Sequence, residues 1–256
     1  MRGELIADTG TVLGFLLTLV RVAGVFVFVP IPGISSVLAP ARVLLTLGIT
    51  FALFGLWPHV STIPSAGEFV MWIGLEAALG IGIGLSVAFV AESLAVGAQI
   101  LGLQAGYSFA STIDPSTQAD STVLVILSQL ASGLLFFTTG LDREVLRIFA
   151  RSLETFPAGS FNLSRSAGAQ IVAAGSTMLA TGLRLALPVV AVLLMIDISL
   201  ALLGRVNAQL HLLHIAFPVK MTVGLALLGW IAVLLPALFR ATANTTLSAA
   251  RGLLVH

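Results

Sequence analysis

The chain has 256 residues, of which 58% are hydrophobic and only 9% are charged, and its formal net charge is +1. Soluble domains carry about 25% charged residues, so this composition excludes a freely soluble globular enzyme. The small net charge provides no basic field that would attract nucleic acid. With no cysteine, the chain has no disulfide framework and no thiolate metal site. We therefore expect an integral membrane protein, or one that is delivered through the membrane.

Apolar stretches of helical length recur along the whole chain. A bilayer core of about 30 Å is spanned by about 20 helical residues, and most of the stretches approach that length. They lie at Thr11–Val29, Val43–Leu56, Phe69–Val90, Thr122–Gly140, Ile171–Leu203 and Ile215–Phe239. The sequence therefore predicts an all-α fold of about six apolar helices, in a single domain over residues 1–256.

The first stretch has the position of a secretory signal but lacks its composition. It is longer than the usual apolar core, and Glu4 and Asp8 weaken the basic region that should precede such a core. We expect this segment to be retained.

The stretch Ile171–Leu203 is long and contains Pro188. Proline lacks a backbone N–H, and its ring clashes with the preceding helical turn. We therefore expect a helix break at Pro188, either as a kink or as a division into two helices.

Residues Asp142–Phe156 combine apolar and basic side chains at helical spacing. Val145, Phe149 and Leu153 recur on one face, and three arginines follow at intervals of four on another. The pattern predicts a short amphipathic helix whose basic face meets solvent, lipid headgroups or a partner. The arginines are Arg143, Arg147 and Arg151.

Ionisable side chains interrupt the apolar stretches. They are Arg21, Glu76, Arg184 and Asp197, with Glu92 just beyond the third stretch. Each costs about 2.5–3.5 kcal/mol at the centre of a bilayer, so they should face protein or water. They either pair inside a helical bundle or line a pore or relay. Glu76 and Glu92 are 16 residues apart, about 160° around a helix, so they cannot line one surface.

Glycines recur at a spacing of four in two places, at Gly80 and Gly84 and again at Gly102 and Gly106. Small residues at this spacing allow helices to approach closely in a membrane. Packing within this chain is the simpler interpretation, and a contact between subunits is the alternative.

The sequence contains none of the common catalytic motifs: no Gly-x-Ser-x-Gly turn, Walker loop or His-Glu-x-x-His pair. His211 and His214 lie three residues apart, but no Cys, Asp or Glu close by would complete a metal site. We predict that the protein is not an enzyme and that it binds no cofactor and no metal.

The segment Gly106–Ser121 separates two strongly apolar stretches with small and polar residues, and it contains the chain's one tyrosine. A turn between spanning helices needs only a few residues. Irregular backbone near membrane depth is tolerated where it is buried in protein or lines a watery cavity. The segment is therefore either a structural loop or a gating, pore-lining segment.

This segment and its surroundings resemble the FliR family, flagellar export-gate subunits whose relatives serve virulence type III secretion. The matching stretches follow the family's order along nearly the whole chain. They are Arg21–Phe26 with Pro30, Pro40–Val43, Gly102–Ala110 with Asp114 and Pro115, Pro157–Gly159, Leu183–Pro188 and Phe217–Lys220. Asp142–Glu144 stands where flagellar members often carry histidines, so a virulence (injectisome) subunit remains the alternative.

The resemblance implies an export-gate subunit made of bent helical hairpins in the bacterial inner membrane, at the flagellar basal body. Its expected partners are FliP-like and FliQ-like gate subunits, FlhB-like and FlhA-like export proteins, membrane lipid and unfolded protein substrates in transit. The ionisable side chains, together with Lys220, would then be buried in the subunit or lie between subunits. No nucleic acid is expected.

The resemblance also implies that the loop after Gly106 contributes to a plug that keeps the channel closed. Tyr107, Phe109 and Ile113 would fill the constriction. Four polar residues would hold the backbone of the loop: Ser111, Thr112, Asp114 and Ser116. Gly106, Ser108 and Pro115 also belong to the predicted plug loop.

A hypothesis of a different class is a self-contained secondary transporter or channel. It would use Arg184, Asp197 and a break at Pro188 as a substrate site in the middle of the membrane, as discontinuous helices do. Against it, the halves of the chain show no inverted repeat.

Overall fold

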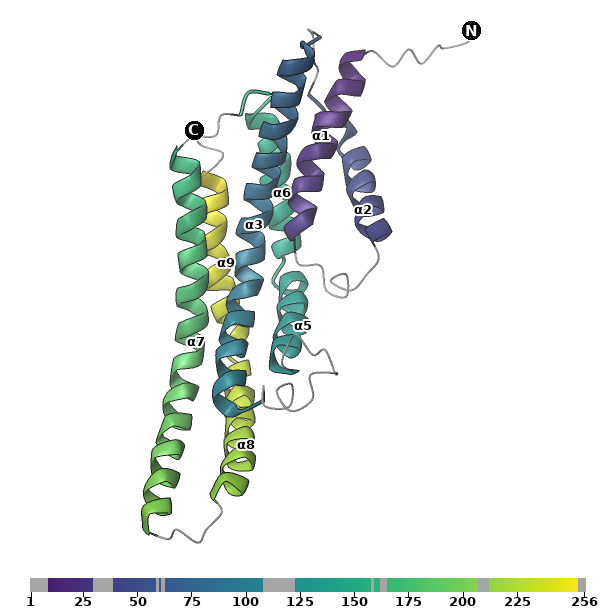
Figure 1. The fold of residues 1–256 in the computed structure, drawn as a ribbon. Helices are drawn as coiled ribbons and strands as arrows, with labels where there is room; N and C mark the ends of the chain where they lie inside the picture. Colours follow the sequence, from purple (N-terminus) through teal and green to yellow (C-terminus); the bar gives the residue numbers. More distant parts are fainter. Residues whose placement is uncertain are drawn as a thin grey trace. The chain divides into compact units, whose positions relative to one another are not determined.

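The computed structural model describes residues 9–29, 39–58, 60, 63–107, 123–157, 159–161, 165–206 and 212–252. All regular secondary structure in these ranges is helical, which confirms the predicted all-α fold (Figure 1). The chain forms two compact units, each assembled from segments that are distant in the sequence. Two long helices, α3 (Ala66–Ala105) and α7 (Arg165–Val206), contribute residues to both units.

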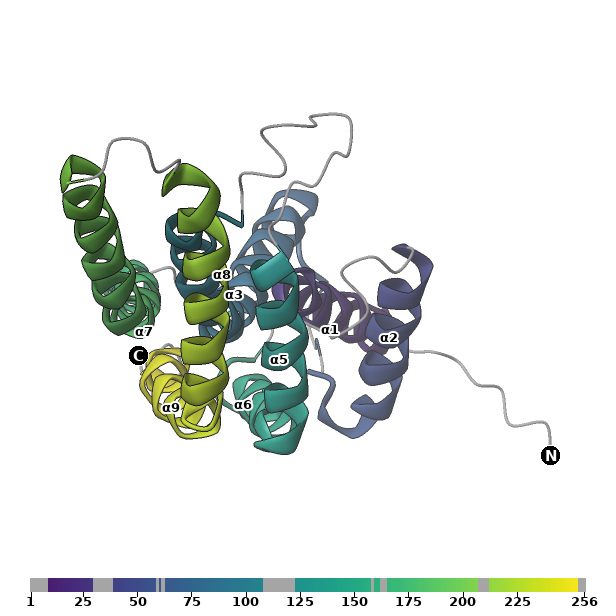
Figure 2. The same cartoon turned by 90° about the horizontal axis from the view of Figure 1, so that it is seen from below.

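The first unit comprises Met1–Phe89, Gly140–Gly175 and Ala243–His256. It contains α1 (Thr9–Phe28), α2 (Ala39–Ala52), the 3₁₀ helix η1 (Phe54–Leu56), α6 (Leu141–Thr155) and the adjoining parts of α3, α7 and α9 (Leu235–Gly252). Helices α1 and α2 lie side by side (Figure 2). Trp57 joins them, because its ring centroid lies 5.0 Å from that of Phe15 and its Nε1 donates to the carbonyl of Thr50 at 2.8 Å.

The second unit comprises Val90–Thr139 and Ser176–Thr242. It contains α5 (Val123–Thr138), α8 (Leu212–Ala232) and the remaining parts of α3, α7 and α9. Its core forms where the last turns of α3, the start of α5 and the middle of α7 pack together. The buried residues of this core are Ala98, Leu101, Ala105, Leu124, Val125, Ala186, Val189 and Leu193.

The glycine spacing predicted close helix packing, and α1 and α3 show it in the first unit. A Cβ atom on Gly80 would overlap the carbonyl oxygen of Arg21, and one on Gly84 would lie 2.6 Å from the carbonyl oxygen of Val25. Gly24 on α1 makes the reciprocal approach to the backbone of α3. The Gly80–Gly84 run therefore packs within this chain, as the simpler interpretation predicted.

The helix α3 begins at a capping box. The backbone N–H and the hydroxyl of Ser65 both donate to Oε2 of Glu68 at 2.8 Å, and the N–H of Glu68 donates back to the Ser65 hydroxyl. This reciprocal pair satisfies backbone donors that have no partner in the first helical turn. The helix then continues past Val90, where we expected it to end, to Ala105, because Glu92 and Ser93 interrupt the apolar run without disfavouring helix.

Of the two forms expected for the break at Pro188, a kink or a division, the division does not occur, because helix α7 continues through Pro188 without ending. Proline removes only one N–H donor, whose acceptor would be the carbonyl of Arg184, so the helical residues can continue on both sides of it. The predicted helix Ile215–Phe239 instead divides between Ala232 and Leu235, giving α8 and α9.

Apolar helices long enough to span a membrane are found as predicted, although not every predicted apolar stretch forms one. Three described helices, α1, α3 and α7, are long and apolar enough to cross a membrane, or up to five if each of the bent pairs α5–α6 and α8–α9 makes one span. Val43–Leu56 contributes only the shorter helix α2 and η1. The amphipathic segment is confirmed as α6, with Val145, Phe149 and Leu153 buried.

Candidate functional site

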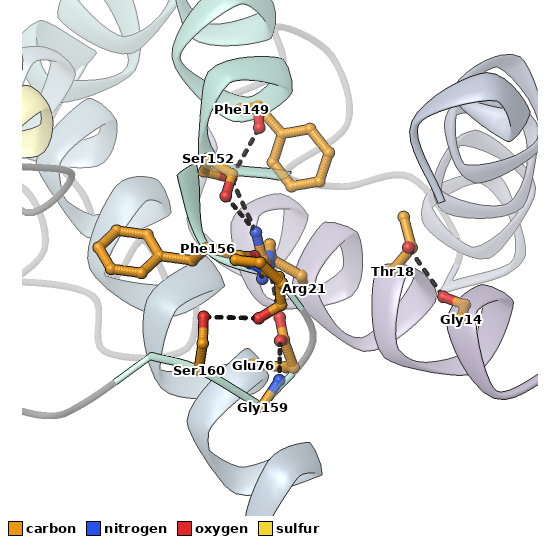
Figure 3. Close-up of polar contacts among 10 residues, drawn as sticks. Gly14, Thr18, Arg21, Glu76, Phe149, Ser152, Phe156, Gly159 and Ser160 are labelled. Atoms are coloured by element: carbon orange, nitrogen blue, oxygen red, sulfur yellow. Dashed lines mark hydrogen bonds and ion pairs between the residues drawn. The ribbon is translucent and has the colours of Figure 1, made fainter. Parts of the chain in front are cut away.

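A buried ion pair connects α1 and α3 in the first unit. Nε of Arg21 lies 2.5 Å from Oε2 of Glu76, and each side chain is 1% exposed (Figure 3). Glu76 uses its other oxygen, Oε1, to accept a hydrogen bond from the backbone N–H of Gly159 at 3.2 Å. These two predicted residues are therefore paired inside the protein and not exposed to lipid.

The same arginine also holds the end of α6. Nη1 of Arg21 donates to the carbonyl of Ser152 at 2.7 Å and to its hydroxyl at 3.3 Å, and Nη2 donates to the carbonyl of Phe156 at 3.0 Å. Carbonyls in the last turn of a helix lack intrahelical partners and carry partial negative charge. The carbonyl of Ser152 already accepts from the N–H of Phe156 at 3.1 Å. The guanidinium adds a second donor there, gives the carbonyl of Phe156 a donor and brings a favourable charge, and it joins α1, α3 and α6.

Glu92 lies on the opposite side of α3 from Glu76, as the spacing of 16 residues predicted. Its side chain is exposed, and so is that of Arg184 on α7. Within the part of the chain that the structure describes, neither residue takes part in an ion pair. Pro188 is exposed one turn beyond Arg184.

A second polar cluster lies in the second unit and connects α3, α7 and α8. The ammonium of Lys220 on α8 lies 3.0 Å from each carboxylate oxygen of Asp197 on α7. The amide nitrogen of Gln104, in the last turn of α3, donates to Oδ2 of Asp197 at 3.3 Å. Within this chain taken alone, the side chain of Lys220 is 14% exposed and that of Asp197 is 40% exposed.

The start of the predicted plug loop adjoins this second cluster. Helix α3 ends in a Schellman motif: the N–H of Tyr107 donates to the carbonyl of Gly102 at 2.9 Å, and that of Gly106 to the carbonyl of Leu103 at 3.3 Å. Gly106 has the positive φ of 87° that this motif requires. The hydroxyl of Tyr107 donates to the carbonyl of Met221, next to Lys220, at 2.9 Å.

Most of the predicted plug loop lies outside the described residues. This applies to Ser108, Phe109, Ser111, Thr112, Ile113, Asp114, Pro115 and Ser116. The roles assigned to them remain predictions.

The sequence reasoning missed several polar partners. Gln104 and Gly159 lie in stretches that carry the family resemblance, but neither they nor Ser152 were assigned a polar partner. Each contacts its partner across 83 to 131 residues of sequence, and no local pattern marks such a contact. A serine inside the amphipathic stretch, at a position facing the buried side of α6, is the one available signal. In the described ranges, no group of three or more His, Asp or Glu side chains could hold a metal.

Known proteins similar to this chain were found by comparing sequences. The profile of the family described as "Bacterial export proteins, family 1" matches residues 12–246. The flagellar biosynthetic protein FliR of Escherichia coli K12 is 31% identical over 212 residues, which are 82% of this chain and 81% of that protein. The FliR proteins of Pectobacterium carotovorum and Bacillus subtilis are 29% and 24% identical, covering 76% and 84% of both chains, respectively.

Proposed function

Because the chain belongs to the family of bacterial export proteins, family 1, we propose that it acts as the FliR-type subunit of a flagellar type III protein export gate. The observation that carries this proposal is the similarity to FliR of Escherichia coli over 82% of the chain. The relatives named above are flagellar, which favours the flagellar machine over a virulence secretion system. The family match over residues 12–246 supports treating the chain as one export-gate domain.

In this proposal the chain resides in the bacterial inner membrane, at the flagellar basal body, and assembles with FliP-like and FliQ-like subunits. FlhB-like and FlhA-like proteins are further partners, and unfolded flagellar proteins pass through the assembled conduit. The apolar surface of α7 supports an assembly in lipid or with other subunits. Only 17% of the most apolar 18-residue part of α7 is buried within this chain, and Leu187 and Met195 are among its exposed side chains.

The rival hypothesis of a self-contained transporter receives less support from the polar residues. Arg184 and Asp197 were to form one substrate site at a break in the helix. Instead, α7 is continuous through Pro188, Asp197 pairs with Lys220, and Arg184 has no ion-pair partner among the described residues.

Purification from cells tests the assignment of the gate. The chain is tagged at its native locus, extracted in mild detergent and analysed for associated proteins. FliP-like and FliQ-like subunits in a stable complex are expected. A lone chain or a homo-oligomer, from cells that contain those subunits, would contradict the proposal and favour the transporter.

A second experiment tests the plug within the proposed gate. Replacing Tyr107, Phe109 and Ile113 together by Gly should leave assembly intact and make the membrane leak small ions. An assembled variant that leaks no more than the wild type would remove the plug assignment, while the gate assignment would still stand on the purification.

A further inference from the structure

A cavity lies between α1 and α2 in the first unit, toward the end of α1 and the start of α2. The two helices run antiparallel. Near their other ends, the ring centroids of Phe15 on α1 and Phe51 on α2 lie 5.4 Å apart, and Trp57 packs against both rings. The cavity has a volume of about 340 Å³. Its lining residues are Leu19, Ala23, Phe26, Val27, Arg42, Val43, Thr46 and Leu47.

The walls of the cavity are two stripes of side chains at helical spacing. On α1, Leu19, Ala23 and Phe26 recur along the side opposite the one that packs against α3 through Gly24. Leu19 and Val27 are eight residues apart, so the cavity extends about 12 Å along α1. Its volume falls at the lower end of the range for small-molecule sites, about 300–1,000 Å³. These dimensions fit a slender, elongated ligand.

Arg42 is the polar group that this cavity offers to a ligand. The hydroxyl of Thr46 is already used within α2, where it donates to the carbonyl of Arg42 at 2.7 Å. The side chain of Arg42 is exposed, and among the described residues no acidic side chain forms an ion pair with it. The first turn of α2 contains no acidic residue either. A guanidinium binds phosphate through parallel N–H···O bonds, so the ligand should carry an anion beside an apolar chain.

The other lining side chains are apolar, which favours lipid over water as the occupant. A buried water needs about two to four polar partners, and this lining does not provide them. Helix α1 has 20 residues and is apolar enough to cross a membrane, and about 20 helical residues span the hydrocarbon core. Val27 lies in the last turn of α1 and Arg42 in the first turn of α2. In a spanning α1 this places the guanidinium at the level of the lipid headgroups.

We propose that the cavity between α1 and α2 binds an anionic phospholipid. Its phosphate lies on Arg42, and one acyl chain lies between the two stripes, toward Leu19 and Leu47. The lipid then joins the two helices at this end of the pair, as the rings of Phe15 and Phe51 join them at the other. This inference goes beyond the proposed function and does not rest on it, because the site requires a membrane and not a gate.

The first experiment measures lipid binding to the purified full-length protein in detergent, together with whatever subunits accompany it. Native mass spectrometry counts bound phosphatidylglycerol, which is anionic, and phosphatidylcholine, which is zwitterionic. The variants are Arg42→Gln, which removes the charge, and Ala23→Phe, which fills the cavity. The controls are Arg205→Gln, an exposed arginine on α7 outside the cavity, and Gly48→Leu on α2, where a Cβ atom has no neighbour within 4 Å. Thermal midpoints verify that each variant is folded.

The wild type should bind phosphatidylglycerol roughly tenfold more tightly than phosphatidylcholine, because hydrogen bonds to a charged group are strong. Arg42→Gln should weaken phosphatidylglycerol binding by about tenfold, equivalent to about 1.4 kcal/mol, and leave phosphatidylcholine binding unchanged. Ala23→Phe should weaken the binding of both lipids, since it occupies the space of the acyl chain. Both controls should stay within about twofold of wild type. Loss of the headgroup preference alone is a result that general destabilisation would not give.

A second measurement places the lipid without a bulky substitution. The chain has no cysteine, so Ala23→Cys introduces a single thiol into the cavity. Modification of this thiol by N-ethylmaleimide, followed by mass spectrometry of the chain, should slow when phosphatidylglycerol is added, and less so with phosphatidylcholine at the same concentration. Gly48→Cys is the control, and its rate should not depend on the lipid. This test remains available if Ala23→Phe does not fold.

Two results would overturn the inference. In the first, the wild type binds both lipids equally, or Arg42→Gln keeps the preference, and no headgroup site exists at Arg42. In the second, the wild type binds neither lipid and the thiol of Ala23→Cys is unreactive without lipid, so a neighbouring subunit covers the cavity. The purification described above is read independently. A lone chain that binds phosphatidylglycerol rejects the gate and keeps the site, and a complete complex that does not bind it rejects the site and keeps the gate.

Discussion

Arg21 of α1 and Glu76 of α3 form an ion pair at 2.5 Å in which neither side chain is more than 1% exposed. The arginine also donates to carbonyls at the end of α6, and the glutamate accepts from Gly159. Every ionised group in this cluster therefore has hydrogen-bond partners, which is the condition under which a buried charge is tolerated. The first unit is joined at this point across three helices.

Removing the negative charge of this pair should destabilise the protein strongly. Glu76→Gln leaves the guanidinium of Arg21 buried without a counter-charge, and the expected loss in free energy of unfolding is about 3 kcal/mol. It is measured as a lower thermal midpoint of the purified complex in mild detergent. Glu92→Gln on the exposed side of the same helix is the control and should change stability by less than about 0.5 kcal/mol. Equal losses for both variants would contradict the structural role of the buried pair.

Adding one methyl group at Gly80 should separate α1 from α3. The new Cβ overlaps the carbonyl oxygen of Arg21, which is backbone and cannot rotate away. Gly80→Ala is expected to cost about 1–3 kcal/mol, as overpacking does, seen as reduced thermal stability and less assembled protein. On the same helix, Gly74 has no atom within 4 Å of its Cβ position. Gly74→Ala should be neutral or stabilising because alanine favours helix, and a similar loss there would reject the packing explanation.

Comparing alanine substitutions at Gly106 and Gly140 distinguishes the cost of backbone strain from the cost of steric overlap. Both have positive φ, 87° and 77°, but only Gly106 has neighbouring atoms close to its Cβ position. Gly140→Ala should cost about 1–2 kcal/mol from the left-handed conformation alone. Gly106→Ala carries the same strain and also meets the ring of Phe217, so its thermal midpoint should fall further. An equal fall for the two variants would show that the ring moves aside freely and that no steric cost is added at Gly106.

Pro188 provides a test of whether a residue in α7 is retained for stability or for function. Pro188→Ala restores a backbone N–H opposite the carbonyl of Arg184, and proline in a helix interior is about 3 kcal/mol less favourable than alanine. We expect a higher thermal midpoint with export at the wild-type level. Reduced export from a more stable complex would show instead that flexibility at Pro188 is needed.

The helical class and most helix positions could be predicted because they depend on local information. Thr11–Val29 and Thr122–Gly140 agree with α1 and α5 within two residues, since an apolar run of 16 to 20 residues is itself the signal. The end of α3 was missed because Glu92 and Ser93 lowered the hydropathy without weakening the helix. The choice between a kink and a division at Pro188 could not be made from the sequence, because the effect of one missing hydrogen bond depends on the packing of the whole helix.

The two polar clusters could be predicted only in part. The cost of burying charge indicated that Arg21, Glu76 and Asp197 need partners, and the structure pairs all three. The identity of the partners could not be predicted, because Glu76 is 55 residues from Arg21 and Lys220 is 23 residues from Asp197. The same reasoning predicted that Arg184 also needs a partner. In the structure it lies exposed on an apolar helix, without an ion pair among the described residues.

The length of α3 constrains how the protein sits in a bilayer. Its 40 residues make a continuous helix about 60 Å long, twice the thickness of a hydrocarbon core of about 30 Å. To lie wholly within the lipid, it would need a tilt of about 60° from the membrane normal, whereas membrane helices tilt by about 0–40°. Its sequence is mainly apolar up to Ala105, with single polar residues such as Glu92, Gln99 and Gln104. Much of the part that extends beyond the lipid must therefore be shielded from water by protein, supplied by this chain and by neighbouring subunits.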